Sequence, residues 1–359
     1  MVMEKTLPIL FPASVVGSMP RPLEVRQMLL ADPPVAPEEY EGCIETAIRR
    51  VVELQDRAGL DVVTDGEYRR ASYIGVIAEL AHGFELSRNP DDGRPWTVVV
   101  DKLSAKCPGF VAREVRFLKQ ITGRQIKATL PAPALLGERM WDSYRSSGAY
   151  STRDAFVRAC VPILHREVEL LRDEGVSIVQ IDDPHLCLFV DEQVRSQYDD
   201  ATAASDFAVE MVNGVVEGIF GVKLAVHLCR RAGARARGET FFEGGYNRII
   251  DQLNRLKVHH LTMEFTTPGA GDMAVFEKLR DDFEIGLGCV GTQPGRIDST
   301  DTIVDRVEQA LRYLSPDRIT LNPDCGFAPG SAAEVSMEEV SIKLQHEAEA
   351  ARRLRDRYG

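Results

Sequence analysis

The feature that most constrains the fold is a repeated alternation of short apolar runs with longer helical patterns. Eight runs are rich in apolar and β-branched residues with little polar alternation, which is typical of strands buried on both faces of a parallel sheet. They are ASVVGS (13–18), DVVTDG (61–66), RQIKATL (124–130), SIVQID (177–182), KLAVHL (223–228), HLTMEF (260–265), EIGLGCV (284–290) and RITLNP (318–323). Between them, the spacing of apolar residues predicts helices over 38–58, 153–174, 302–314 and 336–356.

Eight strand–helix units predict a (β/α)8 TIM barrel in the α/β class, not an open doubly wound sheet. No glycine-rich fingerprint follows the first run, which argues against a dinucleotide-binding fold. The longest interruption, 84–123, lies between the second and third strands, and we interpret it as an insertion hairpin built from WTVVVDKL (96–103) and FVAREVRFL (110–118). Because no Ser/Gly linker divides the chain, we expect residues 1–359 to form a single barrel domain containing this insertion.

Composition limits the class of partner and the compartment. The chain has 43 Lys and Arg against 55 Asp and Glu, a formal net charge of −12, whereas nucleic-acid-binding proteins need a basic surface. No apolar run approaches the roughly 18 residues of a membrane span, and the first residues make a poor signal peptide. Seven sparse cysteines indicate free thiols in a reducing compartment. We therefore expect a cytoplasmic protein with neither nucleic acid nor membrane as partner, and leave a homo-oligomer open.

Charged, hydroxyl and metal-binding side chains collect at the ends of the predicted strands. In a barrel of this kind, the carboxyl ends of the strands form the catalytic face. Burying such groups costs free energy unless they are paired, so we do not expect them to gather there by accident. The residues come from six of the eight strand ends: Ser18; Asp65 and Glu67; Asp182 and Asp183; His227 and Cys229; Glu264; Asp324 and Cys325.

Four of these residues have the side chains of a zinc site. Residues i and i+2 of a strand point to the same side, so His227 and Cys229 should converge. With Cys325 and Glu264 at neighbouring strand ends, the set offers two thiolates, an imidazole and a carboxylate, a suitable tetrahedral zinc shell. The alternative is that both cysteines are small buried residues and His227 is a core imidazole. We assign that filling role to the other five cysteines: Cys43, Cys107, Cys160, Cys187 and Cys289.

Two cysteine ligands favour thiol chemistry over hydrolysis. Such a zinc site can take a substrate thiol as a further ligand and lower its pKa, so that a thiolate is present near pH 7. Hydrolytic zinc sites more often use histidine or carboxylate ligands and keep an open position for water. The ligand set therefore predicts alkylation of a thiol.

Six motifs carry a family resemblance: VVGSMPRP, DVVTDGEYRR, VQIDDP, HLC, MEF and NPDCGFAPG, in this order. They resemble the catalytic C-terminal barrel of cobalamin-independent methionine synthase, and most closely its short single-barrel relatives, over about residues 11–350. HLC together with NPDCG is the specific part. The resemblance implies a zinc-dependent methyltransferase with Zn²⁺ as cofactor, which methylates a small-molecule thiol, homocysteine, through a zinc-bound thiolate to give methionine.

The resemblance also implies roles for individual residues. The implied zinc ligands are His227, Cys229, Cys325 and, as the fourth and displaceable one, Glu264. Glu67 and Asp182 match acidic residues that hold the amino group of homocysteine, a catalytic role in orienting the substrate, and Ser18 matches a residue near its carboxylate.

Plainer roles stay open for the substrate residues. Glu67 and Asp182 also suit structural salt bridges, and Ser18 suits a turn cap. The salt-bridge partners considered are Arg69, Arg70 and Arg296. Arg230, which follows Cys229, is a further substrate-binding candidate for an anionic group, with surface solvation of Arg230 and Arg231 as the alternative.

One departure from the family affects the alkyl donor. The full-length enzymes of this family carry a histidine at the position of Gln293 in this chain, and that histidine is thought to assist methyl transfer from folate. An amide is no general acid near neutral pH, so methylfolate is an uncertain donor. The alternatives are thiol alkylation like that of epoxyalkane:coenzyme M transferase, methyl transfer from a corrinoid protein, and zinc hydrolysis. The pair Glu67 and Asp182 suits an ammonium group and argues against a substrate without an amine.

Overall fold

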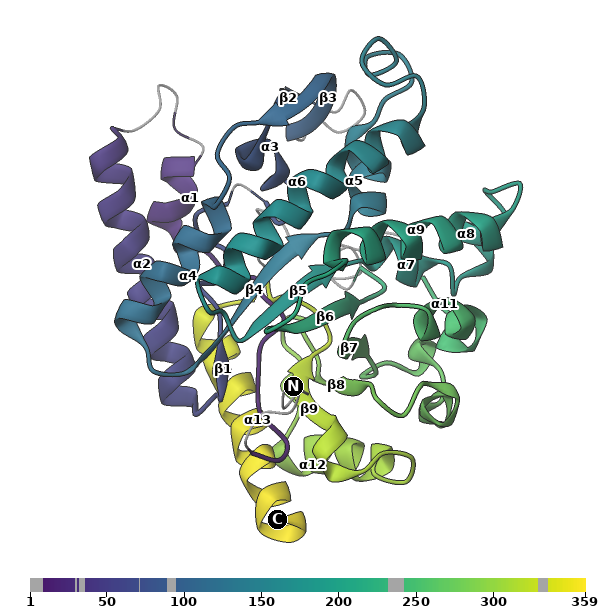
Figure 1. Cartoon of the computed structure of the whole chain (residues 1–359). Helices are drawn as coiled ribbons and strands as arrows, with labels where there is room; N and C mark the ends of the chain where they lie inside the picture. Colours follow the sequence, from purple (N-terminus) through teal and green to yellow (C-terminus); the bar gives the residue numbers. More distant parts are fainter. Residues whose placement is uncertain are drawn as a thin grey trace.

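A computed structural model of the chain describes residues 9–29, 31, 36–70, 72–88, 95–231, 242–328 and 335–359. Strands alternate with helices along the chain, and Figure 1 shows the helices outside the sheet. The strands are β1 (Val62–Val63), β2 (Ala81–Arg88), β3 (Pro95–Ala105), β4 (Gln125–Pro131), β5 (Ile178–Asp182), β6 (Lys223–Leu228), β7 (His260–Glu264), β8 (Glu284–Val290) and β9 (Ile319–Pro323).

The helices include every one that the sequence predicted, with bounds shifted by a few residues at most. They are α1 (Leu23–Leu29), α2 (Pro37–Ala58), α3 (Ile77–Leu80), α4 (Phe110–Ile121), α5 (Pro133–Met140), α6 (Arg153–Asp173), α7 (Pro184–Leu188), α8 (Glu192–Arg195), α9 (Ala201–Val216), α11 (Ile250–Asn254), α12 (Thr300–Ala310) and α13 (Met337–Tyr358). The 3-10 turns are η1 (Tyr246–Ile249), η2 (Pro268–Ala270), η3 (Met273–Lys278) and η4 (Pro316–Arg318). None of the helices in the described part of the chain is long and apolar enough to cross a membrane.

The sheet closes on itself. Seven parallel strands follow one another in the order β1-β4-β5-β6-β7-β8-β9. The gap between the two ends of this order is bridged by Ala13, which pairs with Leu321 of β9, and by Ser14, which pairs with Val62 of β1. The prediction of a (β/α)8 barrel is confirmed, with an apolar core between strands and helices that runs from Phe11 to Leu354.

The first predicted strand, 13–18, is shorter than expected and forms only these two bridges. Pro12 has no N–H to extend the ladder on one side. After Ser14, carbonyl oxygens accept hydrogen bonds from side chains of other strands and not from their backbones: Val15 from Lys127 Nζ (2.7 Å), Val16 from Gln180 Nε2 (3.0 Å) and Gly17 from Thr64 Oγ1 (2.8 Å). The segment therefore leaves the ladder and carries Ser18 to the strand ends.

The donors of these bonds belong to a polar barrel interior, where aliphatic layers are more usual. Lys223 of β6 forms a buried ion pair with Glu284 of β8. His260 Nε2 lies 2.8 Å from Thr320 Oγ1. Burial lowers the pKa of the Lys127 ammonium to about 7. Among these groups, Lys127 holds the 15–17 segment through its hydrogen bond to the Val15 carbonyl oxygen.

An antiparallel hairpin, β2–β3, follows β1 in the chain and precedes β4, which pairs directly with β1 in the sheet. The predicted insertion hairpin is thus present, but its composition was wrong. Its first strand is Ala81–Arg88, and FVAREVRFL forms α4 instead. Val111, Val115 and Leu118 recur at helical spacing and bury one face of that helix, a period that strand pairing cannot satisfy. The residues that connect β2 and β3, 89–94, lie outside the described residues.

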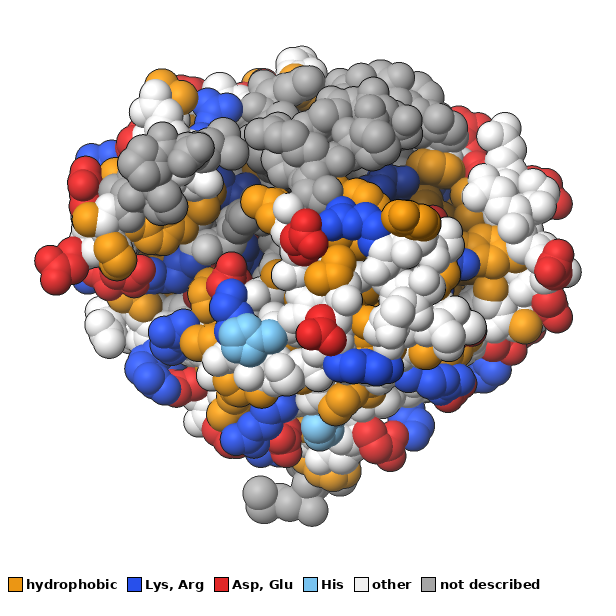
Figure 2. All heavy atoms as spheres, turned by 90° about the horizontal axis from the view of Figure 1, so that it is seen from above, with side chains coloured by type: hydrophobic (Ala, Val, Ile, Leu, Met, Phe, Trp, Pro, Cys, Tyr) orange, Lys and Arg blue, Asp and Glu red, His pale blue; other side chains and the backbone are white. Residues whose placement is uncertain are grey.

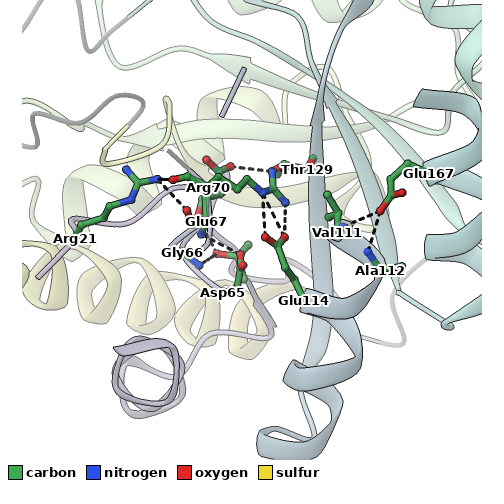
Figure 3. Close-up of polar contacts among 12 residues, drawn as sticks. Arg21, Asp65, Gly66, Glu67, Arg70, Val111, Ala112, Glu114, Thr129 and Glu167 are labelled. Carbon is green, nitrogen blue, oxygen red and sulfur yellow. Dashed lines mark hydrogen bonds and ion pairs between the residues drawn. The ribbon is translucent and has the colours of Figure 1, made fainter. Parts of the chain in front are cut away.

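The N-terminus of α4 is held by a carboxylate from α6. Glu167 accepts hydrogen bonds from the backbone N–H groups of Gly109 (2.6 Å), Val111 (2.7 Å) and Ala112 (3.0 Å), which have no partner within their own helix (Figure 3). We expect Glu167→Ala to lower the free energy of unfolding by about 2–4 kcal/mol, because it leaves these buried donors unpaired. Urea denaturation measures the change.

Glu169→Ala on the same helix is the matched control. Glu169 forms a solvent-exposed ion pair with Arg166, so its removal should change the unfolding free energy by less than about 0.5 kcal/mol. Equal effects of the two variants would contradict the capping role of Glu167.

Candidate active site

Three metal-binding side chains meet at the carboxyl ends of the strands. His227 lies on β6, Cys229 directly after it and Cys325 just after β9. Their candidate ligand atoms all lie within 4.8 Å of one another, and all three residues are buried. The two sulfur atoms are 3.6 Å apart. Elsewhere in the described ranges no other three His, Cys, Asp or Glu side chains converge in this way.

The imidazole of His227 is oriented by a carboxylate. His227 Nδ1 lies 3.2 Å from Asp182 Oδ1, which also accepts a 2.8 Å hydrogen bond from Gln180 Nε2. A carboxylate that accepts a hydrogen bond from one ring N–H leaves the other nitrogen available as a metal ligand, a common arrangement around zinc-binding histidines. Asp182 therefore contributes to the metal-binding group as well as lining the site.

The two thiols lie within hydrogen-bond distance of each other. The hydrogen bond from Cys325, together with the charge of His227, lowers the pKa of Cys229 well below its usual value despite burial. The same hydrogen bond, with burial, raises the pKa of Cys325. The environment thus favours the thiolate form at Cys229 over that at Cys325, and metal binding by both sulfurs would require that both lose their protons.

The geometry of the three side chains fits zinc. Two sulfur atoms bound to one tetrahedral Zn²⁺ at 2.3 Å lie about 3.8 Å apart, close to the observed separation of 3.6 Å. The donor set of two sulfurs and one imidazole nitrogen is one that zinc prefers over magnesium or calcium.

Glu264, the predicted fourth ligand, is placed differently. It ends β7, beside β6, and its negative charge opposes the lowering of the Cys229 pKa and adds to the raising of the Cys325 pKa. However, its Oε2 accepts a 2.8 Å hydrogen bond from the backbone N–H of Arg230, and its carboxylate is not part of the converging group. Its role as a ligand stays a prediction.

Glu67 presents an unusual buried carboxylate (Figure 3). Its backbone φ of 61° is in the left-handed region, where a non-glycine residue is strained. Its Oε1 accepts a 2.7 Å hydrogen bond from Thr129 Oγ1, whereas its Oε2 is buried without a hydrogen-bond partner. Burial, and then the charge of Asp182, raise the pKa of Glu67.

The structural salt bridges considered for Glu67 and Asp182 are not what the structure shows. The three arginines have other partners: Arg69 pairs with Glu41 and Glu45, Arg70 with Glu114, and Arg296 with Asp298. The charge of Arg70 still acts on Glu67 and opposes that of Asp182, and a further cation near both carboxylates would offset the repulsion that remains.

Ser18 lies against residues 326–328, which follow the last strand, β9. Its Oγ accepts a hydrogen bond from Ala328 N (3.3 Å), and its carbonyl accepts one from Phe327 N (2.9 Å). A Cβ on Gly326 would lie 2.2 Å from Ser18 Oγ, and a Cβ on Gly17 would lie 2.5 Å from Glu67 Oε1. Only glycine allows these approaches, which explains both glycines in VVGS and DCGF.

Arg230 is buried and does not lie at the surface, so the solvation alternative is wrong for it. Its guanidinium donates to the carbonyl oxygens of Gly244 (2.6 Å) and Ala270 (3.2 Å) and lies over the ring of Tyr246. Tyr246 Oη in turn accepts a 2.9 Å hydrogen bond from the backbone N–H of Glu264. These contacts support the loops around the site, and a substrate contact by Arg230 stays a prediction.

Sequence reasoning did not single out Thr129, Arg70 and Glu114 as functional, although Thr129 contacts Glu67 directly. Thr129 lies inside a strand, where a threonine is ordinary. On the described surface seen from above, acidic and basic side chains are interspersed (Figure 2).

Comparisons with known proteins identify the family of the chain. The sequence profile of the family described as cobalamin-independent synthase, catalytic domain, matches residues 11–353. A methionine synthase of Pyrococcus abyssi is 28% identical over 331 residues, 89% of this chain and 87% of that protein.

Two solved structures share the fold. A B12-independent methionine synthase from Shewanella sp. W3-18-1, in complex with selenomethionine, has a TM-score of 0.78 at 22% identity and covers 97% of this chain and 98% of its own. A putative vitamin-B12-independent methionine synthase from Listeria monocytogenes has a TM-score of 0.72 at 21% identity, with coverage of 96% and 98%. With a family profile that spans nearly the whole chain and the barrel and strand-end residues in place, the chain belongs to the family of cobalamin-independent synthase catalytic domains.

Proposed function

We propose that this protein is a zinc-dependent methyltransferase that methylates the thiol of homocysteine to form methionine. The observation that carries the proposal is the pairing of a buried His–Cys–Cys group with two buried carboxylates, Glu67 and Asp182, one of which has an unpartnered oxygen. The named relatives are methionine synthases, and one solved neighbour is in complex with selenomethionine, an analogue of the proposed product.

Different residues are proposed to bind different groups of the substrate. His227, Cys229 and Cys325 would hold the metal, and Glu264 is proposed as a fourth, displaceable ligand. Zinc bound there supplies a lowered thiol pKa, so that homocysteine is present as a nucleophilic thiolate at neutral pH. Glu67 and Asp182 accept hydrogen bonds from the substrate ammonium, whose charge offsets their repulsion. Ser18 is proposed to contact the carboxylate of the substrate.

In the transfer itself, sulfur forms a bond to the methyl carbon, and the bond from that carbon to the donor breaks with its electron pair leaving on the donor. Orientation of the thiolate in line with that bond is the main contribution of the amino-acid contacts. Gln293 follows β8, and its backbone carbonyl oxygen accepts a 2.7 Å hydrogen bond from Lys343 Nζ. Since its amide is no acid near pH 7, protonation of the leaving group does not come from this side chain.

The proposal is tested by metal content and thiol binding. We expect about one zinc per chain by mass spectrometry, and tighter binding of homocysteine than of coenzyme M by calorimetry, because only homocysteine has an ammonium for Glu67 and Asp182. Dialysis against a chelator should abolish homocysteine binding, and added zinc should restore it. Methionine formation with methylfolate and with a methylated corrinoid then identifies the donor.

Three outcomes would count against this function. Protein without zinc would remove the metal assignment. A preference for coenzyme M would favour epoxide opening by a sulfonate thiol. Zinc present without binding of either thiol would exclude thiol alkylation.

A further inference from the structure

A buried chain of polar contacts leads from α4 to Glu67 (Figure 3). Glu114 of α4 accepts a 2.7 Å hydrogen bond from Arg70 Nη2. Arg70 Nη1 donates to the carbonyl oxygen of Thr129 (2.8 Å) and to its hydroxyl (2.9 Å). Thr129 Oγ1 contacts Glu67 Oε1 at 2.7 Å. The four side chains thus form one connected path that ends on the carboxylate proposed to bind the substrate ammonium.

The direction of the last hydrogen bond follows from the others. Arg70 carries only donors, so the Thr129 oxygen accepts from it. A hydroxyl has a single proton, and that proton must therefore point to Glu67 Oε1. This commits Oε1 to the protein and leaves Oε2, which has no protein partner, as the oxygen available to a ligand.

Glu114 also balances the charge of Arg70. Both side chains are almost completely buried, at 2% and 1% exposed, and Nε and Nη2 of the guanidinium face the carboxylate. Burial raises the pKa of Glu114 to about 8 against the opposing charge of Arg70. We take the pair as ionised, because Arg70 keeps its proton and a neutral Glu114 would leave a buried cation uncompensated.

The charged groups around Glu67 leave the negative charge of its carboxylate available to a bound cation. Arg21 also comes near, and donates to the backbone carbonyls of Glu67 and Arg70, both at 2.8 Å. Asp65 accepts from the backbone N–H of Glu67 at 2.9 Å. Two cations (Arg21, Arg70) and three anions (Asp65, Glu114, Asp182) surround Glu67, so these groups do not neutralise its carboxylate. The same backbone contacts hold Glu67 in its left-handed conformation.

From this arrangement we propose that Glu114, Arg70 and Thr129 are positioning residues for the substrate ammonium. Arg70 and Thr129 fix the orientation of the Glu67 carboxylate, and Glu114 neutralises the charge of Arg70 behind it. The inference rests on the proposed function and adds residues to the same site. Loss of the Glu114 charge would leave Arg70 uncompensated and repel the ammonium. Loss of the Thr129 hydroxyl would let the Glu67 carboxylate rotate.

The test compares two thiols that differ only in the amine. Homocysteine and 4-mercaptobutanoate bind the zinc-loaded protein in calorimetry, and the ratio of their Kd values reports the contribution of the ammonium. We expect Glu114→Gln and Thr129→Val to lower this preference about five- to tenfold, with the Kd of 4-mercaptobutanoate and the zinc content unchanged. Thr129→Ser keeps the hydroxyl and should restore the wild-type ratio. In steady-state kinetics the homocysteine KM should rise while kcat changes little.

Glu167→Gln is the matched control, since Glu167 is an equally buried glutamate that contacts α4 but not this path. It should leave the Kd ratio at the wild-type value even where it lowers the melting temperature. Equal weakening of both thiols by Glu114→Gln and Thr129→Val, or an unchanged ratio in both, would overturn the positioning role alone. A wild-type protein that does not prefer homocysteine over 4-mercaptobutanoate would overturn the proposed function, and the positioning role with it.

Discussion

Replacement of Cys325 by serine should remove most of the bound zinc and slow methyl transfer by roughly three orders of magnitude. The Cys325 sulfur lies 3.6 Å from that of Cys229, and a serine hydroxyl neither loses its proton near pH 7 nor matches the length of a zinc–sulfur bond. With His227 and Cys229 alone, two ligands would remain from the converging group. Zinc per chain and the rate of methionine formation measure the two effects.

Cys289→Ser is the control for this experiment. Cys289 is a buried cysteine of β8 whose thiol donates to the carbonyl oxygen of Asn322, a bond that serine can keep. It should retain full zinc and near wild-type activity. Retention of zinc by Cys325→Ser would show that Cys325 is not a ligand, and equal losses in both variants would point to a general loss of folding.

The second large effect is expected from Glu67→Gln, which should weaken homocysteine binding about a hundredfold and leave the zinc content unchanged. Thr129 would still donate to the amide oxygen, so the amide NH2 would take the place of the unpartnered Oε2. A donor would then face the ammonium, in addition to the lost negative charge. Calorimetry with homocysteine measures the change, and 4-mercaptobutanoate, which lacks the amine, should bind as before.

Glu347→Gln offers a matched control for the chemistry of this substitution. Glu347 of α13 is also fully buried, with one oxygen that accepts from Ser14 N (3.1 Å) and one without a partner. It contacts the barrel away from Glu67, so homocysteine affinity should stay at the wild-type value. An unchanged affinity in Glu67→Gln would remove Glu67 from the substrate site.

Local patterns in the sequence were enough to predict the barrel and the metal-binding group, but not the path behind Glu67. The i, i+2 spacing of His227 and Cys229 and the position of Cys325 after the last strand follow from strand geometry alone. In contrast, Thr129 and Glu67 are 62 residues apart, and Arg70 and Glu114 are 44 apart. Such contacts depend on how β4 and α4 pack, which no local pattern encodes.

The two errors in the elements have different causes. The 13–18 run has strand composition, yet its carbonyls bond to Lys127, Gln180 and Thr64, side chains that only the closed ring brings to it. The 110–118 run is rich in apolar residues at helical spacing, and its assignment to a strand overlooked that period. The first needed tertiary information, whereas the second was readable from the sequence.

The order in which the metal-binding group is made has a consequence for biosynthesis. Cys325 follows Cys229 by 96 residues, so at 5–20 residues per second a ribosome delivers it about 5–20 s later. During that interval the growing chain has His227 and Cys229 but neither Cys325 nor β9, the strand that closes the ring. Zinc loading of the proposed site would therefore depend on completion of the barrel, and the thiol of Cys229 would have to stay reduced until translation has passed the last strand.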